Sequence, residues 1–273
     1  MANAAGEGMR MRSWAERAHR TRGPLLSLGL SVFGVGLLLG LWPAPAHGLS
    51  TRDALWHMVN GICQPMHAKL GVALPCLKVD STRGFAVVRA PADETRILIV
   101  PTRRIIGVES RILEQDSLPA YWSFAWNERS RVAASAPRPL GWNDIAMVVN
   151  SRVSRTQDQL HIHVGCVDAR LKRALALNAA RLTAEWSPLD LKPWAARYLV
   201  KRVGADGVDG NIFRMVATEV PGAKTRMTRV GIGVVGINGA KGDGGFAVLM
   251  NERRGFAEQL LDHRCSERAA SPW

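Results

Sequence analysis

The chain has 273 residues, of which 47% are hydrophobic and 22% are charged, and its formal net charge is +13. These values are ordinary for a folded globular protein and exclude a chain that is disordered throughout. The charge favours acidic partners such as phosphates or anionic lipid head groups, unless it only reflects an arginine-rich composition. A nucleic-acid-binding protein is not expected, because the sequence has no basic clusters interleaved with aromatic residues and no known motif.

The N-terminus combines a basic segment with a long apolar run. Residues 1–23 carry five arginines against two glutamates, and residues 24–42 are uncharged and rich in Leu and Val. About 20 apolar residues cross a bilayer as a helix, and preceding basic residues stay on the cytoplasmic side. The run exceeds the signal-peptide core of about 7–15 residues, so a transmembrane anchor is favoured. The small residues Ala44-Pro45-Ala46 leave a cleaved signal as the alternative. In both cases most of the chain is exported.

The cysteines agree with an oxidising compartment. Cys63, Cys76, Cys166 and Cys265 form no CxxC pair, and an even number of cysteines in an exported chain predicts disulfides. Three pairings are possible. We favour Cys63–Cys76, which closes a short loop, together with Cys166–Cys265, which ties the C-terminal segment to a strand.

The first half of the exported part begins with a helix. Ser50 and Asp53 form a capping-box start, and the apolar residues that follow have helical spacing, with the two-cysteine loop after them. Strands are expected at residues 85–89 and 96–100, and a helix at residues 121–134 with Trp122, Phe124, Ala125 and Trp126 packed inward.

The second half alternates strands with one clear helix. Strands at residues 144–149 and 160–166, joined by the polar loop 150–158, are expected to form an antiparallel hairpin. Beyond them we expect a helix at 171–182 and strands at 198–203, 212–220, 229–235 and 246–250, the last two joined by the Gly-rich turn 236–245. The pattern is α+β and mostly antiparallel, in one domain of residues 50–273.

Three polar side chains share one face of the strand at 160–166. Residues two apart in a strand point the same way, so Gln159, His161 and His163 are expected on one face. A hydrogen-bonded polar face is one explanation. A metal site is the second, and it needs a third ligand such as His67, His263 or an acid. Nucleophilic attack on phosphorus by a histidine is the third.

The polar loop before this strand favours the third explanation. Asn150, Arg152, Arg155, Thr156 and Gln157 supply amides, a hydroxyl and two guanidinium groups. Such groups bind phosphate oxygens and stabilise a negatively charged transition state. A zinc ion gains nothing from two nearby cations, so the loop indicates an anionic substrate.

The run Asn150-Ser151-Arg152…Arg155-Thr156-Gln157…His161-Ile162-His163…Cys166 resembles the signature of CDP-diacylglycerol pyrophosphatases, members of the histidine-triad (HIT-like) superfamily. The segments at 101–110 and 262–265 also resemble that family, as do Trp122 and Trp126. The resemblance extends from about residue 50 to 266 and includes all four cysteines. The N-terminal apolar run before this range also resembles that of the family.

The resemblance implies a HIT-like α+β fold with a mostly antiparallel sheet and flanking helices, behind an N-terminal transmembrane helix. It implies hydrolysis of CDP-diacylglycerol to CMP and phosphatidic acid without a metal or other cofactor. The middle histidine of the family's His-x-His-x-His motif attacks phosphorus, which here is His161, and His163 is the third member. Gln159 replaces the first histidine and departs from the pattern. It can form hydrogen bonds but cannot titrate near neutral pH.

The sequence therefore predicts an enzyme whose partners are a lipid-linked nucleotide and the membrane. We expect a single-pass protein of the inner membrane with its catalytic domain on the periplasmic side, and the oligomeric state stays open. The alternatives are a general nucleotide pyrophosphatase or nucleotidyl transferase, and a non-catalytic exported protein that binds metal or lipid. The predicted catalytic residues are His161 and His163, and the predicted phosphate-binding residues are Gln159, Asn150, Arg152, Arg155, Thr156 and Gln157.

Overall fold

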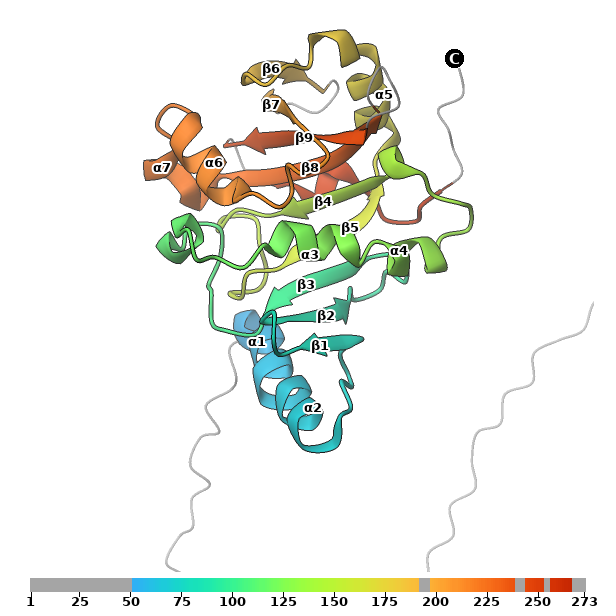
Figure 1. Cartoon of the computed structure of the whole chain (residues 1–273), viewed down its shortest axis with the longest axis vertical. Helices are drawn as coiled ribbons and strands as arrows, with labels where there is room; N and C mark the ends of the chain where they lie inside the picture. Colours follow the sequence, from blue (N-terminus) through green and yellow to red (C-terminus); the bar gives the residue numbers. More distant parts are fainter. Residues whose placement is uncertain (1–50, 192–196, 239–243, 253–255, 267–273) are drawn as a thin grey trace, which may run out of the picture. The chain divides into compact units, whose positions relative to one another are not determined.

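The computed structural model describes residues 51–191, 197–238, 244–252 and 256–266. Within these ranges ten strands form one sheet whose neighbouring strands are all antiparallel (Figure 1). The order is β1-β2-β3-β5-β4-β8-β9-β7-β6, and β10 pairs with β5. The strands are β1 (Lys78–Asp80), β2 (Phe85–Arg89), β3 (Ile97–Pro101), β4 (Ile145–Val149), β5 (Ile162–Val167), β6 (Ser187–Asp190), β7 (Arg197–Val203), β8 (Gly231–Asn238), β9 (Gly244–Asn251) and β10 (Leu261–Asp262).

Short helices flank this sheet. The first, which we call the N-terminal helix, runs from Ala54 to Leu70 as α1 (Ala54–Met58), one π-type turn (Val59–Cys63) and α2 (Gln64–Leu70). It ends at Gly71, which adopts a left-handed φ of 68°. The others are α3 (Tyr121–Asn127), α4 (Ser130–Ser135), α5 (Ala169–Leu177), α6 (Ile212–Glu219) and α7 (Ala223–Arg226), with 3₁₀ turns at Thr51–Asp53, Arg111–Glu114, Trp142–Asp144, Ala179–Arg181, Met227–Arg229 and Glu258–Leu260.

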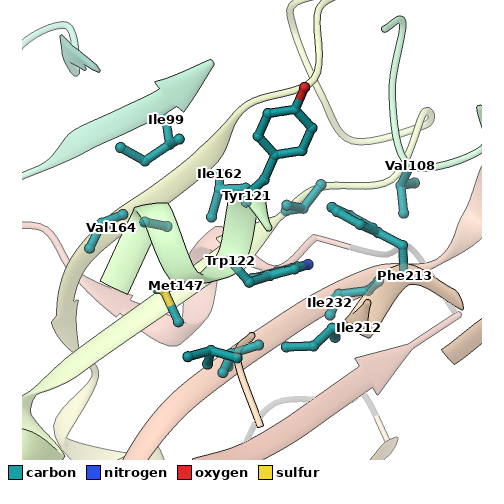
Figure 2. Packing of buried hydrophobic residues seen from close by; sticks show 14 of the residues in the cluster. Ile99, Val108, Tyr121, Trp122, Met147, Ile162, Val164, Ile212, Phe213 and Ile232 are labelled. Carbon is teal, nitrogen blue, oxygen red and sulfur yellow. The ribbon is translucent and has the colours of Figure 1, made fainter. Parts of the chain in front are cut away.

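One face of the sheet carries the largest apolar core. Trp122 of α3 packs against Phe213 of α6, with their ring centroids 5.2 Å apart, over the side chains of Met147, Ile162 and Val164 (Figure 2). The buried positions of α3 recur at i, i+1, i+4 and i+5, the spacing of a helix with one apolar face. Ile162 and Val164 belong to this face, so the alternating residues of β5 must lie on the other.

The opposite face carries two separate apolar clusters. The N-terminal helix buries Leu55, Val59 and Cys63 over β2 and β3, while α5 packs with β4, β8 and β9. His163 lies in register between Leu98 of β3 and Val148 of β4. Those two neighbours belong to different clusters, so the histidine face is a polar band between them.

The coarse fold prediction is confirmed as α+β with an antiparallel sheet. The two favoured disulfides, Cys63–Cys76 and Cys166–Cys265, are present. The expected hairpin of the strands at 144–149 and 160–166 is also present as paired β4 and β5. The predicted segments 1–23 and 24–42 lie outside the described residues, and within the described part of the chain no helix is long and apolar enough to span a bilayer.

Three predicted elements need correction. The strand predicted at 212–220 is the helix α6, because its buried residues follow helical spacing and the Asn211 side chain accepts a hydrogen bond from Arg214 N at 3.0 Å as an N-cap. The helix predicted at 121–134 divides after Asn127 into α3 and α4. The first helix continues past Cys63 to Leu70, so the loop before Cys76 is shorter than expected. The short strands β1, β6 and β10 were not predicted.

The disulfides should differ in their contribution to stability. Cys166 and Cys265 are 99 residues apart, whereas Cys63 and Cys76 are 13 apart. A cross-link that closes a longer loop restricts the unfolded chain more, so we expect losses of about 5 kcal/mol for Cys166→Ala/Cys265→Ala and about 3 kcal/mol for Cys63→Ala/Cys76→Ala. Urea unfolding of both variants measures the difference. Equal losses would show that loop closure does not set the contribution of these bridges.

Candidate active site

His161 lies one residue before β5 and is 7% exposed. Its Nδ1 is 2.7 Å from the backbone oxygen of Gln159. A carbonyl oxygen only accepts hydrogen bonds, so Nδ1 carries the proton and Nε2 keeps its lone pair. The neutral ring therefore presents Nε2 as a nucleophile.

His163 lies beside His161 on the same face. The two ring centroids are 4.8 Å apart with an interplanar angle of 64°. His163 Nε2 approaches Glu258 Oε1 at 3.4 Å without forming a hydrogen bond, and neither of its ring nitrogens has a hydrogen-bond partner among the described residues. A buried imidazole with an unsatisfied N–H has a donor ready for a substrate oxygen.

The environment keeps both rings neutral. Burial lowers the pKa of His161, with nearby Arg155 and Arg96 acting in the same direction, while the Gln159 carbonyl and Glu258 oppose the shift. Burial also holds the pKa of His163 well below its usual range, with further lowering by His161 and Arg96. Nε2 of His161 is thus unprotonated near neutral pH.

Glu258 and Arg96 also belong to this site, although neither was predicted to have a functional role. Arg96 Nη1 donates to Glu258 Oε2 and Asn150 Nδ2 donates to Glu258 Oε1, both at 2.5 Å. Asn150 Oδ1 in turn accepts from the backbone N–H groups of Ala257 (2.8 Å) and Glu258 (3.3 Å). Glu258 is 108 residues from Asn150, so local pattern offers no signal. The nearest clue is the Cys166–Cys265 bridge, which brings this segment to β5.

Gln159 is fully buried and holds the segment that follows β3. Its Nε2 donates to the backbone oxygens of Pro101 and Arg103, each at 2.9 Å, and its Oε1 accepts from Ile105 N at 3.3 Å. Both amide hydrogens are therefore committed to the backbone. The predicted contact of Gln159 with phosphate stays a prediction.

Arg155 is also part of the framework. Its guanidinium makes a bidentate pair with Glu109 at 2.8 Å and contacts Asp158 Oδ1 through Nε and Nη2, with its side chain 3% exposed. Asp158 also pairs with Arg52, and Arg52 and Arg155 hold its pKa at about 2. Two carboxylates thus offset the Arg155 charge, which was predicted to face phosphate.

Gln157 connects the polar loop to the N-terminal helix. Its Oε1 accepts from Leu55 N at 2.8 Å, and its Nε2 donates to Thr51 O at 2.9 Å. Arg152 and Thr156 differ from the rest of the predicted set because both are exposed. These two have the freest side chains for a phosphate oxygen.

Of the third ligands weighed for a metal site, an acid lies nearest to the two histidines, because Glu258 Oε1 is 3.4 Å from His163 Nε2. His263 Nδ1 lies 3.4 Å from Asp93 Oδ2, and His67 lies on α2. Among the described residues, no three His, Cys, Asp or Glu side chains group so as to hold an ion.

Comparison with known proteins shows which family this sequence resembles. The family model described as CDP-diacylglycerol pyrophosphatase matches residues 50–269. A CDP-diacylglycerol pyrophosphatase from Yersinia pestis is 34% identical over 223 residues, which cover 79% of this chain and 85% of that protein.

Replacing Gln159 with Glu should destabilise the protein although the shape of the side chain is kept. The new oxygen would face the carbonyl oxygens of Pro101 and Arg103, where Nε2 now donates. We expect the free energy of unfolding to fall by about 3 kcal/mol, since buried acceptors lose their donor. Urea unfolding measures the loss, with the exposed Gln115→Glu as the matched control. A loss as small as that of the control would rule out the bracing role.

The two histidines should make stability depend on pH below neutrality. Their pKa values in the folded protein lie below the value of about 6.5 for a free histidine, so the unfolded chain binds more protons in that window. The free energy of unfolding is then highest above about pH 6.5 and falls as the pH decreases toward 5. His163→Gln should flatten this dependence, while the exposed His57→Gln should not. Urea unfolding at several pH values tests it, and an identical slope in both variants would contradict it.

Proposed function

The chain belongs to the CDP-diacylglycerol pyrophosphatase family, hydrolases of CDP-diacylglycerol, and we propose that it cleaves this substrate through a nucleotidyl-histidine on His161. The observation that supports this mechanism is the hydrogen bond from His161 Nδ1 to the Gln159 carbonyl. It orients the ring and directs the lone pair of Nε2 away from the backbone. A histidine held in this way can form a covalent intermediate with an electrophilic phosphorus.

In the first step, Nε2 of His161 attacks the phosphorus that carries cytidine. The bond from that phosphorus to the bridging oxygen breaks, and phosphatidate leaves with the electron pair. The ring becomes positively charged as the N–P bond forms. The Gln159 carbonyl accepts from Nδ1–H and stabilises this charge, as an acceptor placed before the reaction should.

In the second step, water attacks the same phosphorus and the N–P bond breaks. The electron pair returns to Nε2, CMP leaves, and the proton from water is released. The products are CMP and phosphatidic acid, and the neutral tautomer of His161 is regenerated. No step requires Gln159 to exchange a proton, which fits an amide at that position.

The remaining groups act on the phosphate oxygens. The single N–H of neutral His163 lacks a partner among the described residues and donates to a non-bridging or leaving oxygen. Arg152 and Thr156, which are exposed on the polar loop, supply charge and a hydroxyl donor. Asn150, Arg155, Gln157 and Gln159 hold the loop and the neighbouring segments in place.

The finer fold and location belong to the same proposal. The sheet is HIT-like, with the histidine strand β5 near its centre, behind a transmembrane helix at residues 24–42. The helix anchors the enzyme in the inner membrane and leaves the catalytic domain on the periplasmic side. Support comes from the basic residues before the apolar run and from the two disulfides, which suit an oxidising compartment.

His161→Ala should abolish CMP release from CDP-diacylglycerol and should give no labelled protein when substrate labelled in the cytidylyl phosphate is quenched rapidly. Wild type should give a labelled protein that decays as CMP appears. His163→Ala should lose about a hundredfold or more in rate, since one donor to the transition state is removed. The exposed His57→Ala is the matched control and should keep full activity. Persisting turnover in His161→Ala would remove the nucleophile assignment.

A further inference from the structure

The second half of the N-terminal helix and the turn after it expose an unusual set of apolar side chains. Ile62, Leu70, Val72 and Leu74 are 46%, 69%, 39% and 63% exposed. They make up half of the large hydrophobic residues that are exposed in the described part of the chain, yet they lie within thirteen residues of sequence. We call these four residues the apolar tip. Several exposed apolar side chains this close together in the sequence indicate a contact site.

The apolar tip is held in place and is not a loose loop. The Cys63–Cys76 bridge closes the segment, and both cysteines are buried in the cluster over β2 and β3. Gly71 ends the helix in a left-handed conformation and turns the chain back. The helix passes beyond β1 at the edge of the sheet, so the turn after α2 projects from the domain (Figure 1). The apolar side chains are therefore kept away from the protein's own core.

The charge around the apolar tip favours an anionic surface. Residues 61–79 contain Lys69 and Lys78 and no Asp or Glu. Lys69 is exposed next to Leu70, whereas Lys78 pairs with Glu128 at 2.6 Å. An apolar surface flanked by a cation is suited to the boundary between acyl chains and anionic head groups.

We propose that the apolar tip docks on an anionic lipid bilayer and gives the catalytic domain a second membrane contact besides residues 24–42. The proposal rests on the proposed function in two respects, the lipid nature of the substrate and the insertion of residues 24–42 in a bilayer. A bilayer is favoured over a second copy because the apolar run ends at Trp42, and only the eight residues 43–50 separate it from Thr51. Those eight residues span at most about 28 Å. The N-terminal helix is about 25 Å long. The tip can therefore reach the bilayer in which the run is inserted.

Docking of the tip would also orient the histidines. The helix that bears the tip is fixed to the polar loop, because Gln157 bonds Leu55 N and Thr51 O. Arg52 pairs with Asp158 at 2.8 Å, and Gln64 Nε2 donates to Thr102 O at 2.9 Å. The tip and the site thus form one body, which fits cleavage of a head group that stays at the membrane surface.

The double variant Leu70→Glu/Leu74→Glu tests the contact in the full-length chain. Both residues are largely exposed, so folding should be unaffected. Wild type is mixed with vesicles of phosphatidylcholine and phosphatidylglycerol, and amide hydrogen exchange is measured at residues 68–76. We expect these amides to gain protection with vesicles and the double variant to lose that gain. Leu177→Glu, which replaces a 76% exposed leucine on α5 far from the tip, is the matched control.

Activity measurements separate this inference from the proposed function. CMP release is compared between CDP-diacylglycerol in vesicles and a short-chain analogue that is soluble as a monomer. The double variant should lose about tenfold on the vesicle substrate and keep its rate on the soluble one. Equal rates on both substrates together with unchanged exchange would overturn the docking proposal and leave the function standing. Protection that rises with protein concentration in the absence of vesicles would overturn it in favour of self-association. Failure to hydrolyse either substrate would contradict the function, and the exchange experiment would still decide the contact.

Discussion

Two imidazole rings buried side by side in a sheet must remain neutral, and most of the polar contacts around them follow from that constraint. Burial between two apolar clusters lowers the pKa of His161 and His163, and the cations nearby act in the same direction. Arg96 would repel any protonated ring, but Glu258 accepts from it at 2.5 Å and offsets its charge. Arg155 is offset in the same way by Glu109 and Asp158. The site therefore contains several paired charged groups around two neutral rings, and in the proposed mechanism the phosphorus of the substrate meets a ring nitrogen that needs no deprotonation.

The polar residues around the site divide into those whose side chains bond to other groups of the protein and those whose side chains are exposed. A buried polar side chain is stable only when its hydrogen bonds are made inside the protein. Backbone or carboxylate partners satisfy the buried side chains of Asn150, Arg155 and Gln159. The half-buried Gln157 likewise bonds to the backbone at the start of the N-terminal helix. Arg152 and Thr156 can stay free because they are exposed. Of the residues named here, His163 is the exception, since it is buried and lacks a hydrogen-bond partner among the described residues. An exception of that kind points to a substrate contact.

The sequence predicted those parts of the molecule that depend on local pattern. Alternation placed His161 and His163 on one face of β5, and Ile162 and Val164 on the other. The segment 212–220 was predicted wrongly as a strand, because a short apolar run with β-branched residues does not separate strand from helix until the Asn211 cap is recognised. Glu258 was missed because its role depends on a contact across 108 residues. Residues of the polar loop were predicted to bind phosphate because of their residue type. Whether such a side chain instead bonds within the protein depends on its burial, which residue type does not reveal.

Gln159 stands where the His-x-His-x-His motif of the resemblance has its first histidine, and these contacts give that residue a physical explanation. The acceptor that fixes the tautomer of His161 is the backbone oxygen of residue 159, which every amino acid supplies. The side chain at 159 is then free to serve the segment after β3, where two carbonyls need donors and one N–H needs an acceptor. A neutral histidine has one donor and one acceptor, so it would leave one of these groups unsatisfied, whereas glutamine satisfies all three. Glutamine therefore holds the segment after β3 and leaves the orientation of His161 unchanged, because the side chain and the backbone of one residue perform separate tasks.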